Sequence, residues 1–165
     1  MTQKVPFTHQ SVIITIFISL VTLGLYIPLW FITYRTALNS LQAQKQLPIT
    51  GPVVTLVLLG TWHLFNFLSF FTDFTGDNES LNNIYDSIYF ISFIAGIIWS
   101  IILSFQVQRM LSSYTQTQKY AVGYVGLFTF LFNIFYLQFK VNQLIRYEEN
   151  QVWDIDSIGQ HLKNN

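Results

Sequence analysis

Four long apolar runs constrain this chain more than any other feature of its sequence. They cover residues 11–34, 53–74, 88–107 and 120–139. A helix needs about 20 mostly apolar residues to cross the roughly 30 Å hydrocarbon core of a bilayer, and each run has about that length. Only 10% of the residues are charged, whereas soluble domains carry about 25%. The runs therefore predict a protein embedded in a membrane.

The expected fold is all-α, a polytopic transmembrane helical bundle with about four hydrophobic segments. Helices are expected because a backbone in lipid must satisfy its own hydrogen bonds, and the runs lack the alternation of barrel strands. We expect residues 1–165 to form a single membrane domain. Residues 140–165 form a polar tail, in which spaced apolar residues suggest an amphipathic helix.

The charges do not favour one orientation of four full crossings. Cytoplasmic loops are rich in Lys and Arg, and the chain has neither between Lys45 and Arg109. We therefore expect loop 75–87 on the outer face of the inner (cytoplasmic) membrane, with the chain crossing that membrane several times. Four crossings would then leave four basic residues on each side. An incomplete crossing by the first run, or a last run that dips and returns, would remove this conflict.

The first run contains the sequence from Gly24 to Pro28, where a kink or break is expected. Proline lacks an N–H, and its ring clashes with the carbonyl four residues earlier, which belongs to Gly24. Beyond the bend, Tyr26 and Trp30 share a face and suit the headgroup level, and Arg35 can extend to water. A kinked span with an aromatic belt is favoured over a half-helix lining a binding site or a re-entrant hairpin.

The third run carries a stripe of small residues at four-residue spacing, Ser92, Gly96, Ser100 and Ser104. Small side chains on one helix face allow two helices to approach closely in lipid. The stripe predicts close helix packing inside the chain, with an oligomer or partner interface as the alternative.

Polar residues within the other runs are candidate functional residues, because polar groups are costly in a membrane. His63 and Asn66 lie three residues apart on one face, and Asn133 and Lys140 lie seven apart on another. For His63 an interhelical hydrogen bond is favoured over a functional role. We expect these polar stripes to face one another in the bundle.

The motifs of catalytic and cofactor chemistry are missing from the sequence. The chain has no cysteine, and His63 is the one histidine within a run, so a haem with two axial ligands and a clustered metal site are not expected. Nucleotide-binding loops and nucleophile elbows are absent, and a net charge of zero does not suggest nucleic acid. We therefore expect no enzyme activity, no cofactor and no metal.

Two stretches near the ends of the chain carry a family resemblance. They are Thr22-Leu23-Gly24-Leu25-Tyr26 with Trp30, Tyr34-Arg35 and Leu38-Asn39, and the later stretch Tyr136-Leu137-Gln138-Phe139-Lys140-Val141-Asn142. Through these stretches the chain resembles a bacterial family of small membrane proteins catalogued as domain of unknown function 4234. The resemblance implies an inner-membrane protein with a role in envelope maintenance, and it brings no catalytic residues.

Two functions are compatible with these patterns. The favoured one is a non-enzymatic protein that supports envelope integrity, the permeability barrier or intrinsic antibiotic tolerance, assembling with itself or with another membrane protein in the bilayer. The alternative is a small transporter or channel with polar residues in the interior of the bundle.

Overall fold

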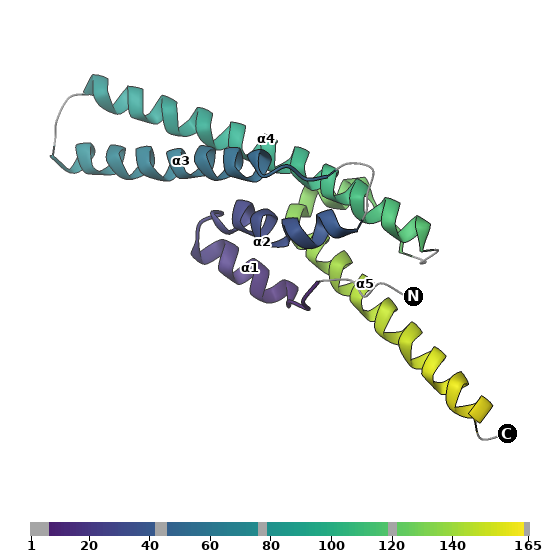
Figure 1. Cartoon of the computed structure of the whole chain (residues 1–165). Helices are drawn as coiled ribbons and strands as arrows, with labels where there is room; N and C mark the ends of the chain where they lie inside the picture. The colour runs from purple at the N-terminus through teal and green to yellow at the C-terminus, as the bar shows by residue number, and fades with distance from the viewer. Residues whose placement is uncertain (1–6, 42–45, 76–78, 119–121, 164–165) are drawn as a thin grey trace.

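The computed structural model describes residues 7–41, 46–75, 79–118 and 122–163, which form helices and no strand. The helices are α1 (Val12–Val21), α2 (Tyr26–Ser40), α3 (Thr50–Thr75), α4 (Glu79–Thr117) and α5 (Gly126–Lys163) (Figure 1). The expected all-α fold is therefore confirmed. Within the expected loop 75–87, residues 76–78 lie outside the described part, and the remainder is helical from Glu79 onward.

A long antiparallel hairpin of α3 and α4 is the main scaffold of the molecule. In the described part of the chain, two segments are long and apolar enough to cross a membrane, Thr50–Phe70 and Asn83–Thr117. The helices pack closely, since a Cβ added to Gly96 would lie 2.7 Å from the Leu59 side chain, and one added to Gly51 would lie 2.7 Å from that of Leu103. Where four full spans were expected, the described structure thus has two helices that are long and apolar enough to cross a membrane.

The first apolar run is two helices joined by a tight turn, not one kinked span. Leu23 and Gly24 have positive φ angles of 48° and 90°, and the Thr22 hydroxyl accepts the backbone N–H of Tyr26, the first residue of α2, at 3.0 Å. Pro28 lies in the first turn of α2, where its missing N–H costs little. The ten residues of α1 rise only about 15 Å, half of a bilayer core.

The hairpin of α1 and α2 points in the same direction as the tip of the α3–α4 hairpin, and the start of α1 and the later part of α5 lie toward the opposite end (Figure 1). The break expected between Gly24 and Pro28 is present, but it reverses the chain. The favoured single kinked helix is therefore wrong, and the run has the helical hairpin that the re-entrant alternative requires.

The last apolar run also folds back on itself. Asn133 has φ 45° and ψ −124°, which interrupts α5 between residues 126–132 and 134–163. The Tyr136 hydroxyl accepts the backbone N–H of Val125 at 2.9 Å, although a straight helix would separate these two residues by about 16 Å. The expected segment 120–139 is thus a short arm and the start of a long one. Beyond residue 150 the helix continues, but the amphipathic pattern falls on side chains outside the described ones.

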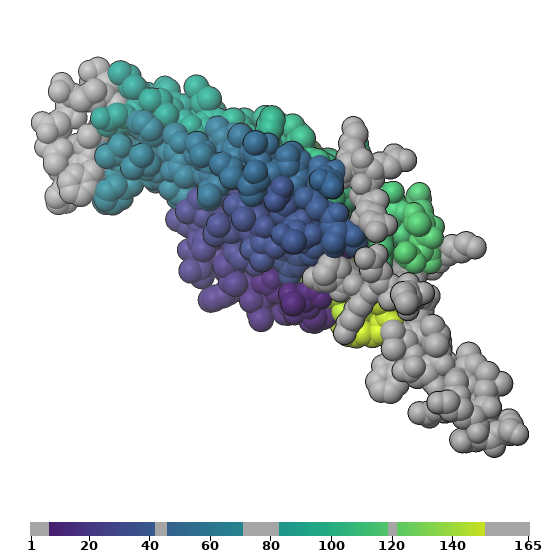
Figure 2. Space-filling model, viewed as in Figure 1, coloured from purple at the N-terminus to yellow at the C-terminus, as the bar shows by residue number. Residues whose placement is uncertain are grey.

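The core lies at the end of the molecule where α2, α4 and α5 meet. Its fully buried residues include Trp30 and Phe31 of α2, Leu111 of α4, and Leu137 and Val141 of α5. The opposite part of the α3–α4 hairpin extends beyond the other helices (Figure 2). Three helices far apart in the sequence therefore converge at one end.

Replacing Gly24 by alanine should destabilise the protein by about 1 kcal/mol or more, because a side chain at positive φ is strained. The matched control is Gly60→Ala, since Gly60 is helical and a Cβ there also meets nothing within 4 Å. Thermal unfolding in mild detergent, followed by circular dichroism, measures both changes. Equal midpoints for Gly24→Ala and Gly60→Ala would contradict the left-handed turn at Gly24.

Candidate functional site

A buried network of neutral amides and aromatic donors joins three parts of the chain. The indole N–H of Trp30 donates to Oε1 of Gln138 at 2.7 Å. The side-chain nitrogen of Gln138 donates to the carbonyl oxygen of Gln10 at 3.3 Å and to Oδ1 of Asn142 at 3.0 Å. Trp30 and Gln138 are fully buried. The network therefore ties α2 and α5 to the segment before α1.

Gln10 is the residue in this network with the most partners. Its carbonyl oxygen accepts a hydrogen bond from the Asn142 side chain at 2.6 Å. Its own side-chain nitrogen donates to the Tyr26 hydroxyl at 2.8 Å, and its Oε1 accepts from the Tyr34 hydroxyl at 3.1 Å. The Tyr34 ring stacks on Trp30 with 4.7 Å between centroids, and burial raises the pKa of Tyr34. Its hydroxyl is protonated near neutral pH in any case, so it is a donor.

The functional groups in this network suit a structural role. Its members are neutral amides, phenols and an indole, and these groups satisfy one another's donors and acceptors. Such groups are poor nucleophiles and poor proton acceptors near neutral pH. Removing one member leaves buried polar atoms unpaired, which typically costs about 1–3 kcal/mol. The arrangement is suited to holding helices in register.

A second polar contact anchors the connector between α2 and α3. Asn39 both accepts the N–H of Leu47 at 2.7 Å and donates to its carbonyl oxygen at 3.1 Å. The Arg35 Nε donates to the same carbonyl at 3.0 Å. Arg35 was expected to extend toward water, but its guanidinium is half-buried against the chain. Trp30 was expected at the headgroup level, and it instead lies fully buried in the core.

The small-residue stripe of α4 packs inside the chain. Ser92, Gly96, Ser100 and Ser104 are all buried. The Asn133 side chain donates to Oγ of Ser100 at 2.9 Å and accepts a hydrogen bond from Ser104. Two serines of α4 therefore hold Asn133, the residue at which α5 turns. The expected contact between the polar stripes of α4 and α5 is present at this point.

His63 and Asn66 do not join Asn133. The Nε2 atom of His63 is buried without a hydrogen-bond partner in the described structure, and its ring lies 4.4 Å from that of Trp62. Asn66 is exposed on α3. The Nε2 atom of His63 does not make the interhelical hydrogen bond that was favoured for this residue. His63, Asn66 and Asn133 were expected to face one another in the interior of the bundle, and they do not.

Lys140 is nearly buried on the second arm of α5. Its ammonium donates to Oε1 of Gln143 at 3.1 Å and lies 5.4 Å from the ring centroid of Tyr136 and 5.6 Å from those of Tyr124 and Phe139. Burial lowers the pKa of Lys140. This cation is held by aromatic faces.

The residues that carry the family resemblance at the two ends of the chain meet in space. Trp30 and Tyr26 come from the first stretch, and Gln138 and Asn142 come from the second. Gln10 has no comparable signal in the sequence, because it is a single polar residue at the start of an apolar run. Its role becomes visible only when the first hairpin is folded.

The described residues hold no group of three His, Asp or Glu side chains suited to a metal ion. No protein-family model, curated protein or solved structure matches this chain.

Replacing Gln138 by leucine should lower the free energy of unfolding by about 1–3 kcal/mol, because the Trp30 N–H and the Gln10 carbonyl lose a partner. Gln116→Leu, on the exposed end of α4, is the matched control and should have little effect. Unfolding in detergent followed by tryptophan fluorescence measures both changes. Wild-type stability of Gln138→Leu would mean that the network does not hold α2 to α5.

Proposed function

We propose that this chain is a small, non-enzymatic protein of the bacterial inner membrane. In this proposal α3 and α4 cross the bilayer, and the α1–α2 hairpin and the bent start of α5 enter from the cytoplasmic side and return. The protein would support envelope integrity, the permeability barrier and intrinsic antibiotic tolerance by assembling in the membrane. The resemblance described for the two end stretches is the source of the envelope role.

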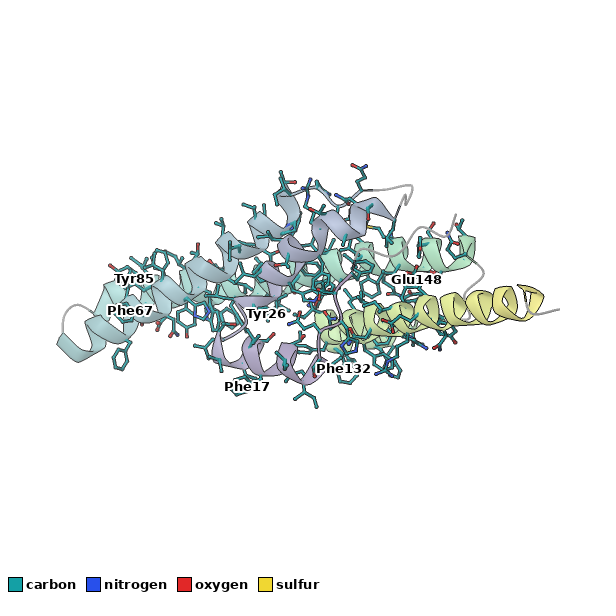
Figure 3. All side chains as sticks on the ribbon, turned by 60° about the horizontal axis from the view of Figure 1, so that its bottom comes forward. Phe17, Tyr26, Phe67, Tyr85, Phe132 and Glu148 are labelled. Atoms are coloured by element: carbon teal, nitrogen blue, oxygen red, sulfur yellow. The ribbon has the colours of Figure 1, made fainter. Side chains whose placement is uncertain are left out.

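The exposed surface supports placement in a bilayer. Large apolar side chains are exposed on α1, α3, α4 and α5, with exposed fractions of 78% for Ile13, 68% for Phe70 and 62% for Leu127. In Figure 3 Phe17 and Phe132 lie along one edge of the molecule, and Phe67 lies toward the far end of the α3–α4 hairpin. Apolar surface on this scale is rare in soluble monomers and suits contact with lipid.

The distribution of charge is the observation that carries the proposed topology. In the proposed topology of two crossings and two returning hairpins, the order of the sequence assigns all eight Lys and Arg residues to the cytoplasmic side. The acidic residues around Glu79 then lie on the opposite side. This arrangement satisfies the excess of cytoplasmic Lys and Arg in membrane proteins, and it removes the four-against-four conflict of four full crossings.

Assembly through α3 is supported by a polar side chain on its outer surface. Asn66 is exposed on the Thr50–Phe70 segment, whereas the Nε2 atom of the nearby His63 is covered by this chain's own side chains. Polar side chains facing lipid favour association with another helix. A second copy of α3 offers the same exposed amide, so we propose self-association at Asn66.

A transporter or channel draws less support from the geometry. That function would need His63, Asn66 and Asn133 to line a shared interior. Asn133 instead bonds to Ser100 and Ser104, and Asn66 faces outward.

The topology predicts which positions react with a membrane-impermeant maleimide in spheroplasts. Because the chain has no cysteine, single substitutions give labelling without background. Asn83→Cys should be labelled, whereas Thr8→Cys and Asn150→Cys should be labelled only after the membrane is opened. Four full crossings would place residues 8 and 150 outside, so labelling of either one in intact spheroplasts would contradict the proposal.

Loss of the protein should raise uptake of a fluorescent dye and sensitivity to antibiotics, and the wild-type gene should restore both. Interhelical polar contacts contribute about 0.6–2 kcal/mol, so Asn66→Leu should reduce the dimer fraction several-fold and restore the barrier less completely. Cross-linking through Phe70→Cys, which lies one helical turn from Asn66 and is 68% exposed on α3, measures the dimer. Asn83→Leu, also exposed, is the control.

Unchanged permeability in the deletion strain would refute the envelope role. Normal cross-linking in the Asn66→Leu background would refute assembly through this face and leave the envelope role standing.

A further inference from the structure

An open groove lies between α1 and the two arms of α5. Its volume is about 430 Å³, within the roughly 300–1,000 Å³ range of small-molecule sites. Val12 and Ile16 of α1 form one wall, and Phe128 and Phe132 of the first α5 arm form another. The groove exists because α5 turns at Asn133, which separates the two arms and leaves α1 across the gap.

Lys140 is the one charged residue among those that line the groove. Its ammonium contacts Gln143 and three aromatic rings, and none of the described carboxylates forms an ion pair with it. A cation removed from water without an anion is costly. The groove therefore combines a long apolar surface with one site that an anion would stabilise.

In the proposed placement, Lys140 lies on the cytoplasmic side of the turn in α5. It is seven residues beyond Asn133, which is about 10 Å along the helix. Phe132 and Phe128, at the deeper part of the groove, are partly exposed beside it. An amphiphile aligned with the helices would place its anionic end at Lys140 and its chain against these rings.

We propose that this groove binds one anionic phospholipid of the inner leaflet, with its phosphate on the Lys140 ammonium and an acyl chain along Val12, Ile16, Phe128 and Phe132. Basic pockets between helices on the cytoplasmic side are a known means of binding anionic lipids. The inference rests on the proposed placement in the membrane. A free phosphate would not use the apolar walls, and a peptide would find few polar partners for its backbone along them.

Native mass spectrometry of the purified full chain in mild detergent tests the proposal. After addition of phosphatidylglycerol, the wild-type protein should retain one lipid per chain, and it should retain phosphatidylcholine several-fold less. Lys140→Gln should reduce phosphatidylglycerol retention several-fold, and Lys140→Arg should keep it, because the charge is conserved. Arg146→Gln removes an exposed charge on the same helix and should leave retention unchanged.

Circular dichroism spectra matching the wild type would show that the variants are folded. Equal retention of phosphatidylglycerol by wild type and Lys140→Gln would overturn the proposal, as would displacement of the lipid by inorganic phosphate at millimolar concentration. Lipid retention in detergent does not depend on the orientation of the chain in cells. The spheroplast labelling therefore tests the membrane placement separately from the groove.

Discussion

The hydrogen bond from the Trp30 indole to the Gln138 amide joins residues that lie 108 positions apart in the chain. Between lipid-embedded helices there is little hydrophobic driving force, so close packing and polar contacts must supply the specificity of association. Here the contact brings Gln10 and Asn142 into the same network, and it fixes α2 against α5. The packing of the α1–α2 hairpin against α5 depends on this contact, and so do the core and the groove beside α1, because they are built from elements that it holds together.

The sequence predicts well where helices form, but it predicts poorly whether an apolar run forms one continuous helix. Hydropathy measures the length of an apolar run, and a run of 24 residues has the same hydropathy whether it crosses once or turns back in the middle. Gly24 is the sequence signal for the first turn, which depends on positive φ angles and on the hydrogen bond to Thr22 and not on Pro28. At the second turn, the polar character of Asn133 says nothing of its backbone, although Asn is enriched among the non-glycine residues with positive φ.

The candidate site was harder to predict than the fold, because its members lie far apart in the sequence. The stripe from Ser92 to Ser104 is recognisable because four-residue spacing is local information. Its burial follows from packing of Gly96 against α3 and of Ser100 and Ser104 against Asn133 of α5. The amide network has no local period. Gln10 precedes a helix, Trp30 belongs to the next helix, and Gln138 belongs to the last, so their convergence follows only from two chain reversals.

The two chain reversals also make the molecule wider at one end than at the other. Near the far tip only α3 and α4 are present, whereas at the other end α1, α2 and α5 are added around them (Figure 1). In the placement proposed for this chain, the protein displaces more lipid from one leaflet than from the other. A protein that is wider in one leaflet than in the other fits a curved bilayer better than a flat one. Because the turns at Gly24 and Asn133 produce this shape, they would also favour location in membrane regions of a particular curvature.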